Sequence, residues 1–590
     1  SKKLTQVTKF TDFDVKTLDG RAEAVVFEQA GYIHELDPKT GRARIVNIRA
    51  VGDFPWMMPR WDDVTGRIAN IALSPTGKRV VAEARGEIFT IPAEKGDIRN
   101  ITRSAGVAER EPAWSRDGKW VSYFSDRSGE YALVIESQDG ITAPREIAIR
   151  NAKHYYTSSW SPDSKKILYT DTDFNVWVMD VASGQPKLLG NDPWAVPSRT
   201  LNPTWSPDSK WVAYASRLNT LYRAIFVANV ETGEKKQVTD GLADAMFPVW
   251  DPNGKYLWFF ASTDFGLRSQ WLDMTSYDRE ENFGLYLAIL KKGEASPLLP
   301  ESDEDKGAPL EAPRASASPA ASPAPDATAS PSPAAAGASS APVNVVIDFD
   351  GLQQRIVSVA GVPERQYSEL KVGLSGSVYY LQAPDAGGGA RGSTLHRYKL
   401  SDRKTAVFVT GVAEYDVSAD GKKLLYRTPA PGGGPGGPPP AAGAPESRPS
   451  LFLVDADKTP PTAGQGRLDV TLRMNVDPKA EFTQMFNEGW RNQRDYLYVP
   501  NLQGADWPKV KQMYAPLLPY AMHRADLTYL VDMMGAEIAI GHSYVRGGVL
   551  PEIPPSPGGL LGADFAIENS RYRITRIYDN ESWNPDLKAP

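Results

Sequence analysis

Five histidines and no cysteine limit the chemistry open to this sequence. The absence of thiols excludes disulfides, thiolate metal sites and a cysteine nucleophile together. The histidines form no HExxH pattern, which argues against a zinc hydrolase, and they are His34, His154, His396, His523 and His542. Taken alone, a histidine that follows an apolar segment, as His542 does, is more often a hydrogen-bonded structural residue than a catalytic one. The same interpretation stands for the other four.

Length and charge describe a multidomain globular protein. The 590 residues are too many for one ordinary core. Lysine and arginine number 66 against 72 acidic residues, and no long block of either sign occurs. Electrostatic binding to nucleic acid or to an anionic membrane is therefore not expected. No apolar run of membrane-spanning length and no signal peptide stand out, and neither a cofactor nor a metal is expected.

A repeat of about 45 residues predicts the fold class. The turn segments WSRDGKW, WSPDSKK, WSPDSKW and WDPNGKY begin at Trp114, Trp160, Trp205 and Trp250, and weaker copies begin at Leu73, Val372 and Val417. Proline presets the turn, Asp with Gly or Ser closes it, and an alternating strand follows. Short four-stranded sheets bury their faces when they stack radially. Seven copies predict a mainly β fold with a seven-bladed β-propeller over residues 51–470.

Three segments depart from the repeat. Residues 301–342 and 429–449 are rich in proline, alanine, serine and glycine, so we expect them to be disordered insertions inside blades. Residues 1–50 contain a blade-like unit that is out of phase with the other seven. We interpret this unit as the last blade of a preceding propeller.

Near residue 477 the apolar period changes from two to about 3.6. Phe482, Met485, Phe486 and Trp490 fall on one stripe of a predicted helix. A second helix is predicted to begin after Asp506, which suits an N-cap, and a third spans ADLTYLVDMMGAEIAIG and leads directly to His542. A helical segment is thus predicted over 471–550, and strands are predicted to return over 551–590.

This order of segments resembles the tricorn protease family. The specific stretches are FNEGWRNQRDYLY, DWPKVKQMYAPLLP, GAEIAIGHSYV and GGLLGADFAIENSRYRITRIY. Members of that family combine a six-bladed propeller, a seven-bladed propeller, a helical segment, a PDZ domain and a peptidase domain related to C-terminal-processing peptidases. The resemblance covers essentially the whole chain. It implies that residues 1–50 close the six-bladed propeller, that 551–590 begin the PDZ domain, and that the chain is an internal piece.

The resemblance maps the family's catalytic histidine onto His542. In serine hydrolysis such an imidazole accepts the hydroxyl proton as general base and returns it to the leaving amine. The nucleophilic serine, the orienting acid, the oxyanion hole and the specificity residues belong to the family's C-terminal domain, so residues 1–590 alone are expected to be inactive. The family often has serine before the histidine. Here Gly541 stands in that place, and whether Ser543 replaces it stays open.

The resemblance implies a serine-type peptidase that degrades oligopeptides, with the propeller as channel and filter. It implies a homo-hexamer in the cytoplasm, while a periplasmic or exported location stays open. GGLLGAD resembles the carboxylate-binding loop of PDZ domains, although a Gly-Gly turn between strands explains it equally well.

The sequence bears on two other function classes. A non-catalytic propeller scaffold or peptide-binding module is the alternative, since these residues alone complete no Ser/His/acid constellation. A glycan-active enzyme is disfavoured, because the acidic residues lie mostly at turns, as Asp117, Asp163 and Asp208 do.

Overall fold

The computed structural model describes residues 6–149, 153–194, 201–264, 281–300, 343–384, 391–430, 448–550, 561–579 and 583. The chain divides into two compact units, one of Ser1–Pro440 with Pro445–Arg546 and one of Ala441–Ala444 with Gly547–Pro590. The expected insertion 301–342 lies outside the described residues, as does 431–447 of the second expected insertion.

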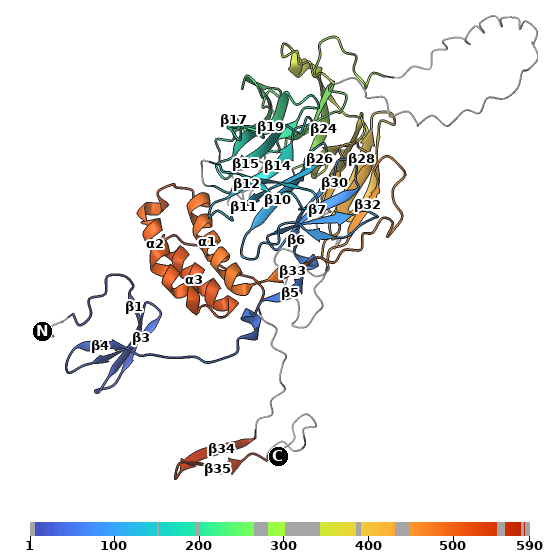
Figure 1. Ribbon diagram of the computed structural model, residues 1–590. Coiled ribbons are helices and arrows are strands. Elements are labelled where there is room, and N and C mark those ends of the chain that lie inside the picture. The colour runs from blue at the N-terminus through green and yellow to red at the C-terminus, as the bar shows by residue number, and fades with distance from the viewer. Residues whose placement is uncertain are drawn as a thin grey trace, which may run out of the picture. The chain divides into compact units, whose positions relative to one another are not determined.

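Seven consecutive antiparallel sheets within the described residues form propeller blades, each built from strands adjacent in sequence (Figure 1). Blades one to four are β6 (Ile68–Leu73), β7 (Arg79–Ala84), β8 (Glu87–Pro92), β9 (Arg99–Asn100); β10 (Glu109–Trp114), β11 (Trp120–Ser125), β12 (Ala132–Ser137), β13 (Arg145–Ile147); β14 (Tyr155–Trp160), β15 (Lys166–Asp171), β16 (Asn175–Asp180), β17 (Pro186–Asn191); and β18 (Thr204–Trp205), β19 (Trp211–Arg217), β20 (Arg223–Asn229), β21 (Lys235–Gln237). Blades five to seven are β22 (Asp244–Trp250), β23 (Tyr256–Ser262), β24 (Gly284–Ile289), β25 (Ile356–Ser358); β26 (Tyr367–Val372), β27 (Ser377–Gln382), β28 (Ser393–Lys399), β29 (Lys404–Val412); and β30 (Glu414–Val417), β31 (Lys423–Arg427), β32 (Leu451–Asp455). The predicted mainly-β fold with propeller blades is confirmed.

The repeated turn has one hydrogen-bond pattern. In blade three, Ser161 Oγ donates to Asp163 Oδ1 at 2.6 Å and accepts from the Lys166 amide at 2.9 Å. Blades two, four and seven repeat this pattern at Ser115, Ser206 and Ser418. The serine and aspartate thus satisfy turn amides locally, and the motif is readable from sequence because its contacts lie within a few residues.

In blades three, four and five, the tryptophan before the turn connects the blade to the preceding one. Its indole N–H donates to a residue of the earlier blade in three cases: Trp160 to Ser122 Oγ (2.9 Å), Trp205 to the Ser159 carbonyl (3.2 Å) and Trp250 to the Thr204 carbonyl (3.3 Å). Buried indoles satisfy their N–H in this way while their rings fill the space between sheets.

Within the described residues blades seven and one share no strand, and side-chain contacts close the ring between them. Leu425 and Leu451 of blade seven join one buried cluster with blade one, and the Leu73 amide donates to Asp416 Oδ2 at 2.8 Å. The segments that enter and leave the ring pair with each other, since β5 (Arg60–Asp63) lies antiparallel to β33 (Arg473–Val476). This two-stranded clasp places the following helices beside the propeller.

Three α-helices follow the propeller: α1 (Pro478–Tyr496), α2 (Trp507–Tyr514) and α3 (Arg524–Ala536). The helices alternate with two 3₁₀ turns, η5 (Leu502–Gly504) and η6 (Ala515–Tyr520). Earlier in the chain the described residues also include the 3₁₀ turns η1 (Pro55–Met57), η2 (Thr65–Arg67) and η4 (Leu352–Arg355). Asp477 caps α1, and Asp506 caps α2 as predicted. The third helix was expected to reach Gly541. It ends at Ala536 instead, because Ala539 adopts a left-handed φ of 58°.

Residues 15–45 form a four-stranded antiparallel sheet of β1 (Val15–Gly20), β2 (Val25–Gln29), β3 (Tyr32–Asp37) and β4 (Arg42–Ile45). It contacts the helical segment through the Phe13 and Tyr514 rings, which meet edge to face at 5.1 Å. Its β1 and β4 are exposed along their whole lengths. That this sheet belongs to a preceding propeller stays a prediction.

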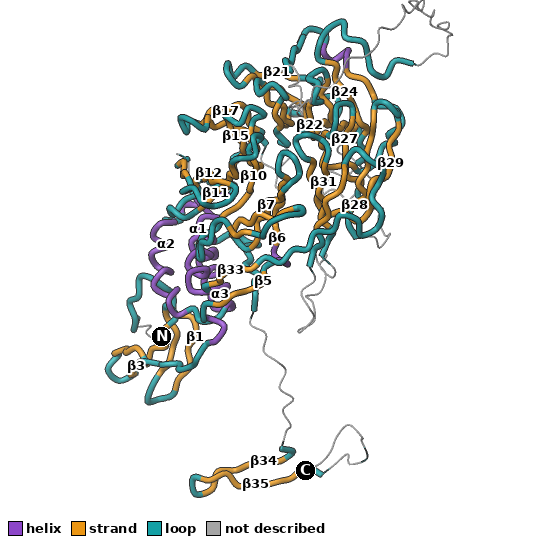
Figure 2. The backbone as a smooth tube through the Cα atoms, turned by 45° about the vertical axis from the view of Figure 1, so that its right-hand side comes forward, coloured by secondary structure: helices purple, strands orange, loops and turns teal. Residues whose placement is uncertain are grey.

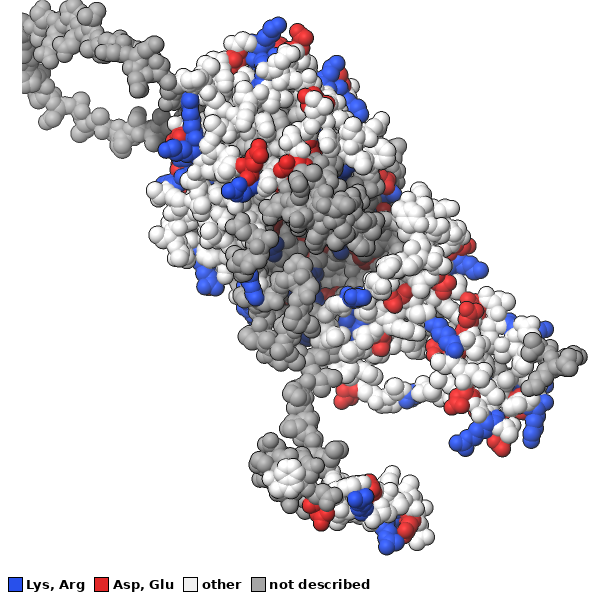
Figure 3. Space-filling model, turned by 180° about the vertical axis from the view of Figure 1, so that it is seen from behind, with Lys and Arg blue, Asp and Glu red and all other residues white. Residues whose placement is uncertain are grey.

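The second unit contains one described hairpin, β34 (Ala563–Glu568) with β35 (Arg571–Ile577). The start of a PDZ domain stays a prediction, since residues 551–560, which include the expected glycine pair of its loop, lie outside the described residues. Over the described ranges no helix combines the length and the apolarity needed to cross a membrane. On the face in Figure 3, acidic and basic side chains of the described residues are interspersed.

Candidate active site

His542 lies six residues after the end of α3, where the chain reverses direction. Its backbone is left-handed, with φ of 65°, a conformation that few non-glycine residues adopt. The residue is exposed, and its ring lies edge-on to Tyr544 with centroids 6.2 Å apart. Among the five histidines, all of which are described, His542 alone is exposed.

After the reversal the chain lies back along α3. The Val545 amide donates to Asp532 Oδ1 at 3.2 Å. Ser543 comes so close to Gly535 that a Cβ added there would lie 3.3 Å from Ser543 Oγ. Ser543, the possible replacement for the family serine that is absent at Gly541, therefore faces α3 and contacts it.

The other four histidines have packing or capping positions. His34 is buried and stacks on Phe27 at 5.0 Å, and His396 is buried and stacks on Tyr380 at 5.4 Å. The side chain of His523 accepts the Ala525 amide at 3.1 Å and forms a capping box with Asp526 at the start of α3. His154 is buried between the propeller and α1.

The apolar side of α1 holds α3 in place. Phe482 and Phe486 of α1 share one buried cluster with Leu527, Leu530 and Met534 of α3. The helices approach closely at Gly489, where an added Cβ would lie 2.5 Å from Val531 Cγ1. The predicted apolar stripe of α1 thus packs against the helix that precedes His542.

Two tryptophans fix the turn from α1 to α2. The indole N–H of Trp490 donates to the Trp507 carbonyl at 3.0 Å, and that of Trp507 donates to the Trp490 carbonyl at 2.9 Å. Their rings stack at 6.4 Å with an interplanar angle of 7°. This reciprocal pair satisfies the indole N–H groups of the buried Trp507 and the half-buried Trp490, and it sets the register of the two helices.

The other side of α1 is charged and docks on loops of blades one to three, and Figures 1 and 2 both place α1 beside β11 and β12. Arg85 of blade one forms a two-bond ion pair with Glu481, at 2.7 and 2.9 Å. Arg494 does the same with Glu130 of blade two, at 2.6 and 2.9 Å. Paired Arg–carboxylate bonds of this kind fix orientation as well as distance.

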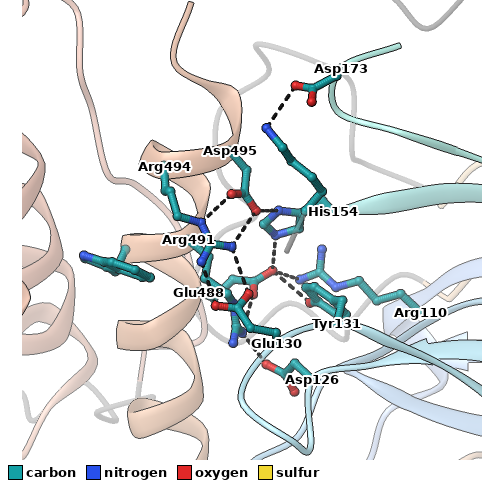
Figure 4. Close-up of polar contacts among 12 residues, drawn as sticks. Arg110, Asp126, Glu130, Tyr131, His154, Asp173, Glu488, Arg491, Arg494 and Asp495 are labelled. Atoms are coloured by element: carbon teal, nitrogen blue, oxygen red, sulfur yellow. Dashed lines mark hydrogen bonds and ion pairs between the residues drawn. The ribbon is translucent and has the colours of Figure 1, made fainter. Parts of the chain in front are cut away.

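Glu488 is the centre of this charged interface (Figure 4). Its two oxygens contact Arg110 at 2.9 Å, Arg491 at 2.8 Å, the Tyr131 hydroxyl at 3.0 Å and His154 Nε2 at 3.1 Å. Arg491 also bonds Asp126 and, at 2.6 Å, the Gly129 carbonyl. Four partners from blades two and three and from α1 itself therefore converge on one carboxylate.

The charges of this cluster perturb its titration. Burial alone would raise the pKa of Glu488, but the bond to His154 and the nearby Arg110 outweigh it and lower the pKa to about 2. The same balance lowers the pKa of Asp495 through His154 and Arg494. The pKa of His154, which burial would lower, is raised by its bonds to Asp495 and Glu488.

Sequence reasoning missed this interface. Glu481, Glu488, Arg491 and Asp495 recur at helical spacing, but such a stripe is the usual sign of a solvated face. The bonds of His154 to α1 join residues 334 and 341 positions apart, and no local pattern connects them.

The described residues place no complete catalytic constellation around His542. Within them, no hydroxyl or carboxylate is hydrogen-bonded to its imidazole, and no group of three or more His, Asp or Glu side chains is arranged to hold a metal ion. The arrangement can supply an exposed imidazole on a helical segment that is docked on the propeller. A nucleophile would have to reach it from elsewhere.

Comparison with known proteins connects the propeller and the helical segment of the first unit to one family. Residues 68–430 match the tricorn protease second β-propeller domain, and residues 478–536 match the tricorn protease C1 domain. In an alignment 609 positions long, the chain is 22% identical to a tricorn protease homolog of Saccharolobus solfataricus. The alignment covers 100% of this chain and 50% of the relative. It is 26% identical to tricorn protease homolog 1 of Streptomyces coelicolor over 96% of this chain and 51% of that protein.

The solved structure of the tricorn protease aligns with 100% of this chain and 52% of its own, with a TM-score of 0.67 at 17% identity, which shows a shared fold. The chain thus spans about half the length of the curated relatives it matches. Because the propeller match alone covers more than half of the 590 residues, the chain belongs to the tricorn protease family.

Proposed function

We propose that this chain is part of a serine-type peptidase that degrades oligopeptides, with His542 as the general base. The observation that carries the proposal is the exposed imidazole of His542, held after α3 at a chain reversal. An imidazole in that position can accept a proton from a serine hydroxyl and return it to the leaving amine. Left-handed backbone at a non-glycine residue is also frequent at functional sites.

The nucleophilic serine, the orienting acid and the oxyanion hole are proposed to lie outside this chain. The relatives are named as proteases, and this chain corresponds to about half of them. The propeller is proposed to act as channel and filter for peptides, and the assembly to be a cytoplasmic homo-hexamer. On this proposal residues 1–590 fold but do not cleave peptides.

The test is mutation of His542 in the longer protein, assayed with fluorogenic peptides. His542→Ala should lower kcat by at least about a thousandfold, as expected when one member of a catalytic unit is removed. His523→Asn is the matched control, since asparagine keeps the α3 cap while removing an imidazole, and it should retain activity. A loss of less than tenfold in His542→Ala would remove this residue from catalysis.

The alternative is a non-catalytic propeller scaffold or peptide-binding module. It is favoured by the lack, within the described residues, of any hydroxyl or carboxylate bonded to His542. Peptide binding by the longer protein without cleavage, unchanged in His542→Ala, is the result expected for that alternative.

A further inference from the structure

His154 has a carboxylate oxygen within hydrogen-bond distance of each ring nitrogen. Nδ1 lies 3.0 Å from Asp495 Oδ2, and Nε2 lies 3.1 Å from Glu488 Oε1. A neutral imidazole has one N–H and one lone pair, so it could satisfy only one of these two acceptors. The other nitrogen would turn its lone pair toward a carboxylate oxygen. Both contacts are favourable together only if the ring is an imidazolium or if one carboxyl is protonated.

Protonation of a carboxyl is opposed by the arginines. Glu488 is bonded to Arg110 and Arg491, and Asp495 accepts from Arg494 Nε at 2.6 Å. Opposite charges at such distances favour the ionised carboxylate. The proton is therefore assigned to His154.

The charge balance of the cluster agrees with this assignment. With a protonated His154 the cluster holds four cations and four carboxylates: Arg110, His154, Arg491 and Arg494 against Asp126, Glu130, Glu488 and Asp495. Loss of the His154 proton leaves a net negative charge, and most of these carboxylates are buried. An uncompensated charge in a buried cluster is strongly destabilising.

The groups that face His154 come from every element around it. The Tyr131 ring lies 5.1 Å away, and the Tyr496 ring lies 5.2 Å away. Lys153, its chain neighbour, is paired with Asp173 at 3.0 Å. The two oxygens that His154 contacts are also bonded by arginines, Glu488 Oε1 by Arg110 at 2.9 Å and Asp495 Oδ2 by Arg494 Nη2 at 3.1 Å. Both arginines are already counted in the charge balance, and neither the two tyrosines nor Lys153, which is paired with Asp173, replaces the charge of His154.

We propose that protonated His154 is a latch between the propeller and α1, so that alkaline pH releases the helical segment from its docked position. Blade three supplies the imidazolium and α1 supplies both acceptors, so the latch acts across the interface. α1 in turn packs on α3 through Gly489 and Val531, and α3 leads to His542. For the proposed peptidase, on which this last step rests, His154 is a positioning residue and not a catalytic one.

The direct test is a titration of the chain labelled with 13C at histidine Cε1, which gives five resonances. The His154 resonance, identified by its loss in His154→Gln, should keep an imidazolium shift at pH 7. Asp495→Asn removes one acceptor with little change of shape and should move the His154 titration to lower pH. A His154 ring that is neutral at pH 7, or unmoved by Asp495→Asn, would overturn the proposal.

The mechanical consequence is measured by hydrogen exchange over α1, normalised to the intrinsic rate at each pH. Wild-type protection should be highest below pH 6.5, should fall up to about tenfold per pH unit between pH 6.5 and the raised pKa of His154 in the docked state, and should level off above it. In His154→Gln it should be low and independent of pH, and in His523→Asn, the matched control, it should follow the wild type. An identical profile in wild type and His154→Gln would refute the latch.

These readouts need no substrate, so they separate the latch from the peptidase. If the longer protein cleaves no peptide at any pH while the titration and exchange behave as described, the proposed function fails and the latch stands. Cleavage that declines at alkaline pH in the wild type and is low at every pH in His154→Gln supports positioning. Identical pH profiles of kcat would refute it.

Discussion

Neutralising Glu488 tests most directly how much the charged interface between the propeller and α1 stabilises the docked helix. Glu488→Gln keeps the shape of the side chain and mimics the protonated acid, so its cost can be worked out from the pKa. The folded protein lowers that pKa from 4.5 to about 2, and one pKa unit corresponds to about 1.4 kcal/mol. The substitution should therefore cost about 3 kcal/mol at pH 7, in line with the penalty for breaking a buried pair.

The pH dependence gives this prediction a second readout. A lowered pKa contributes stability that is complete above the unfolded value of 4.5 and is lost as pH falls toward about 2. The difference between wild type and Glu488→Gln should be constant from pH 7 to 5 and should shrink to about 2 kcal/mol at pH 3.5.

The assay is native-state hydrogen exchange of the α1 amides, because it reports opening of this helix and not unfolding of the whole chain. About 3 kcal/mol corresponds to a loss of protection of roughly 200-fold. Asn492→Ala, an exposed position on the same helix, is the matched control and should change protection less than about threefold. A loss below about fivefold in Glu488→Gln, or a difference that does not shrink in acid, would refute the reasoning.

Four further substitutions test other parts of the fold, each by thermal unfolding. Gly489→Val should destabilise the α1–α3 contact by about 1–3 kcal/mol, because a Cβ would lie 2.5 Å from Val531 Cγ1. Gly541→Ala, where a Cβ meets nothing within 4 Å, should be neutral. Burial lowers the pKa of His396, so stability should be lost as pH falls below 6.5, and His396→Phe should remove that loss between pH 7 and 5. Asp244→Asn should cost about 3–5 kcal/mol, since it leaves the buried Arg223 without its partner, and an unchanged melting temperature would contradict this.

The propeller was predictable because its signals are local. In blades two, three, four and seven the serine and aspartate of the turn bond amides two to five residues away, and seven strong or weak copies of this short motif were enough to count the blades. The cap of α2 at Asp506 was equally local. The end of α3 was not, because the sequence stays apolar through Ile540 while the chain turns at Ala539 to lie back over the helix.

The docked face of α1 could not have been predicted, for a physical reason. A row of Glu, Arg and Asp at helical spacing can either face solvent or pair with opposite charges on another element. Which one surrounds it depends on Arg110, Asp126, Glu130 and His154, which lie more than 330 positions away in the sequence. The sequence marks His154 only as an isolated histidine.

The two faces of α1 contribute differently to the position of the segment that carries His542. The apolar face toward α3 gives stability but little directional preference, because hydrophobic contact is non-directional. The charged face toward the propeller adds little net stability, since buried ion pairs gain about what desolvation costs, yet its two-bond pairs Arg85–Glu481 and Arg494–Glu130 each fix an orientation. They bind the helix near its two ends, so they determine its rotation and its register on the propeller. A tighter apolar interface would have held α1 as strongly while leaving that rotation free, and the place of His542 depends on it.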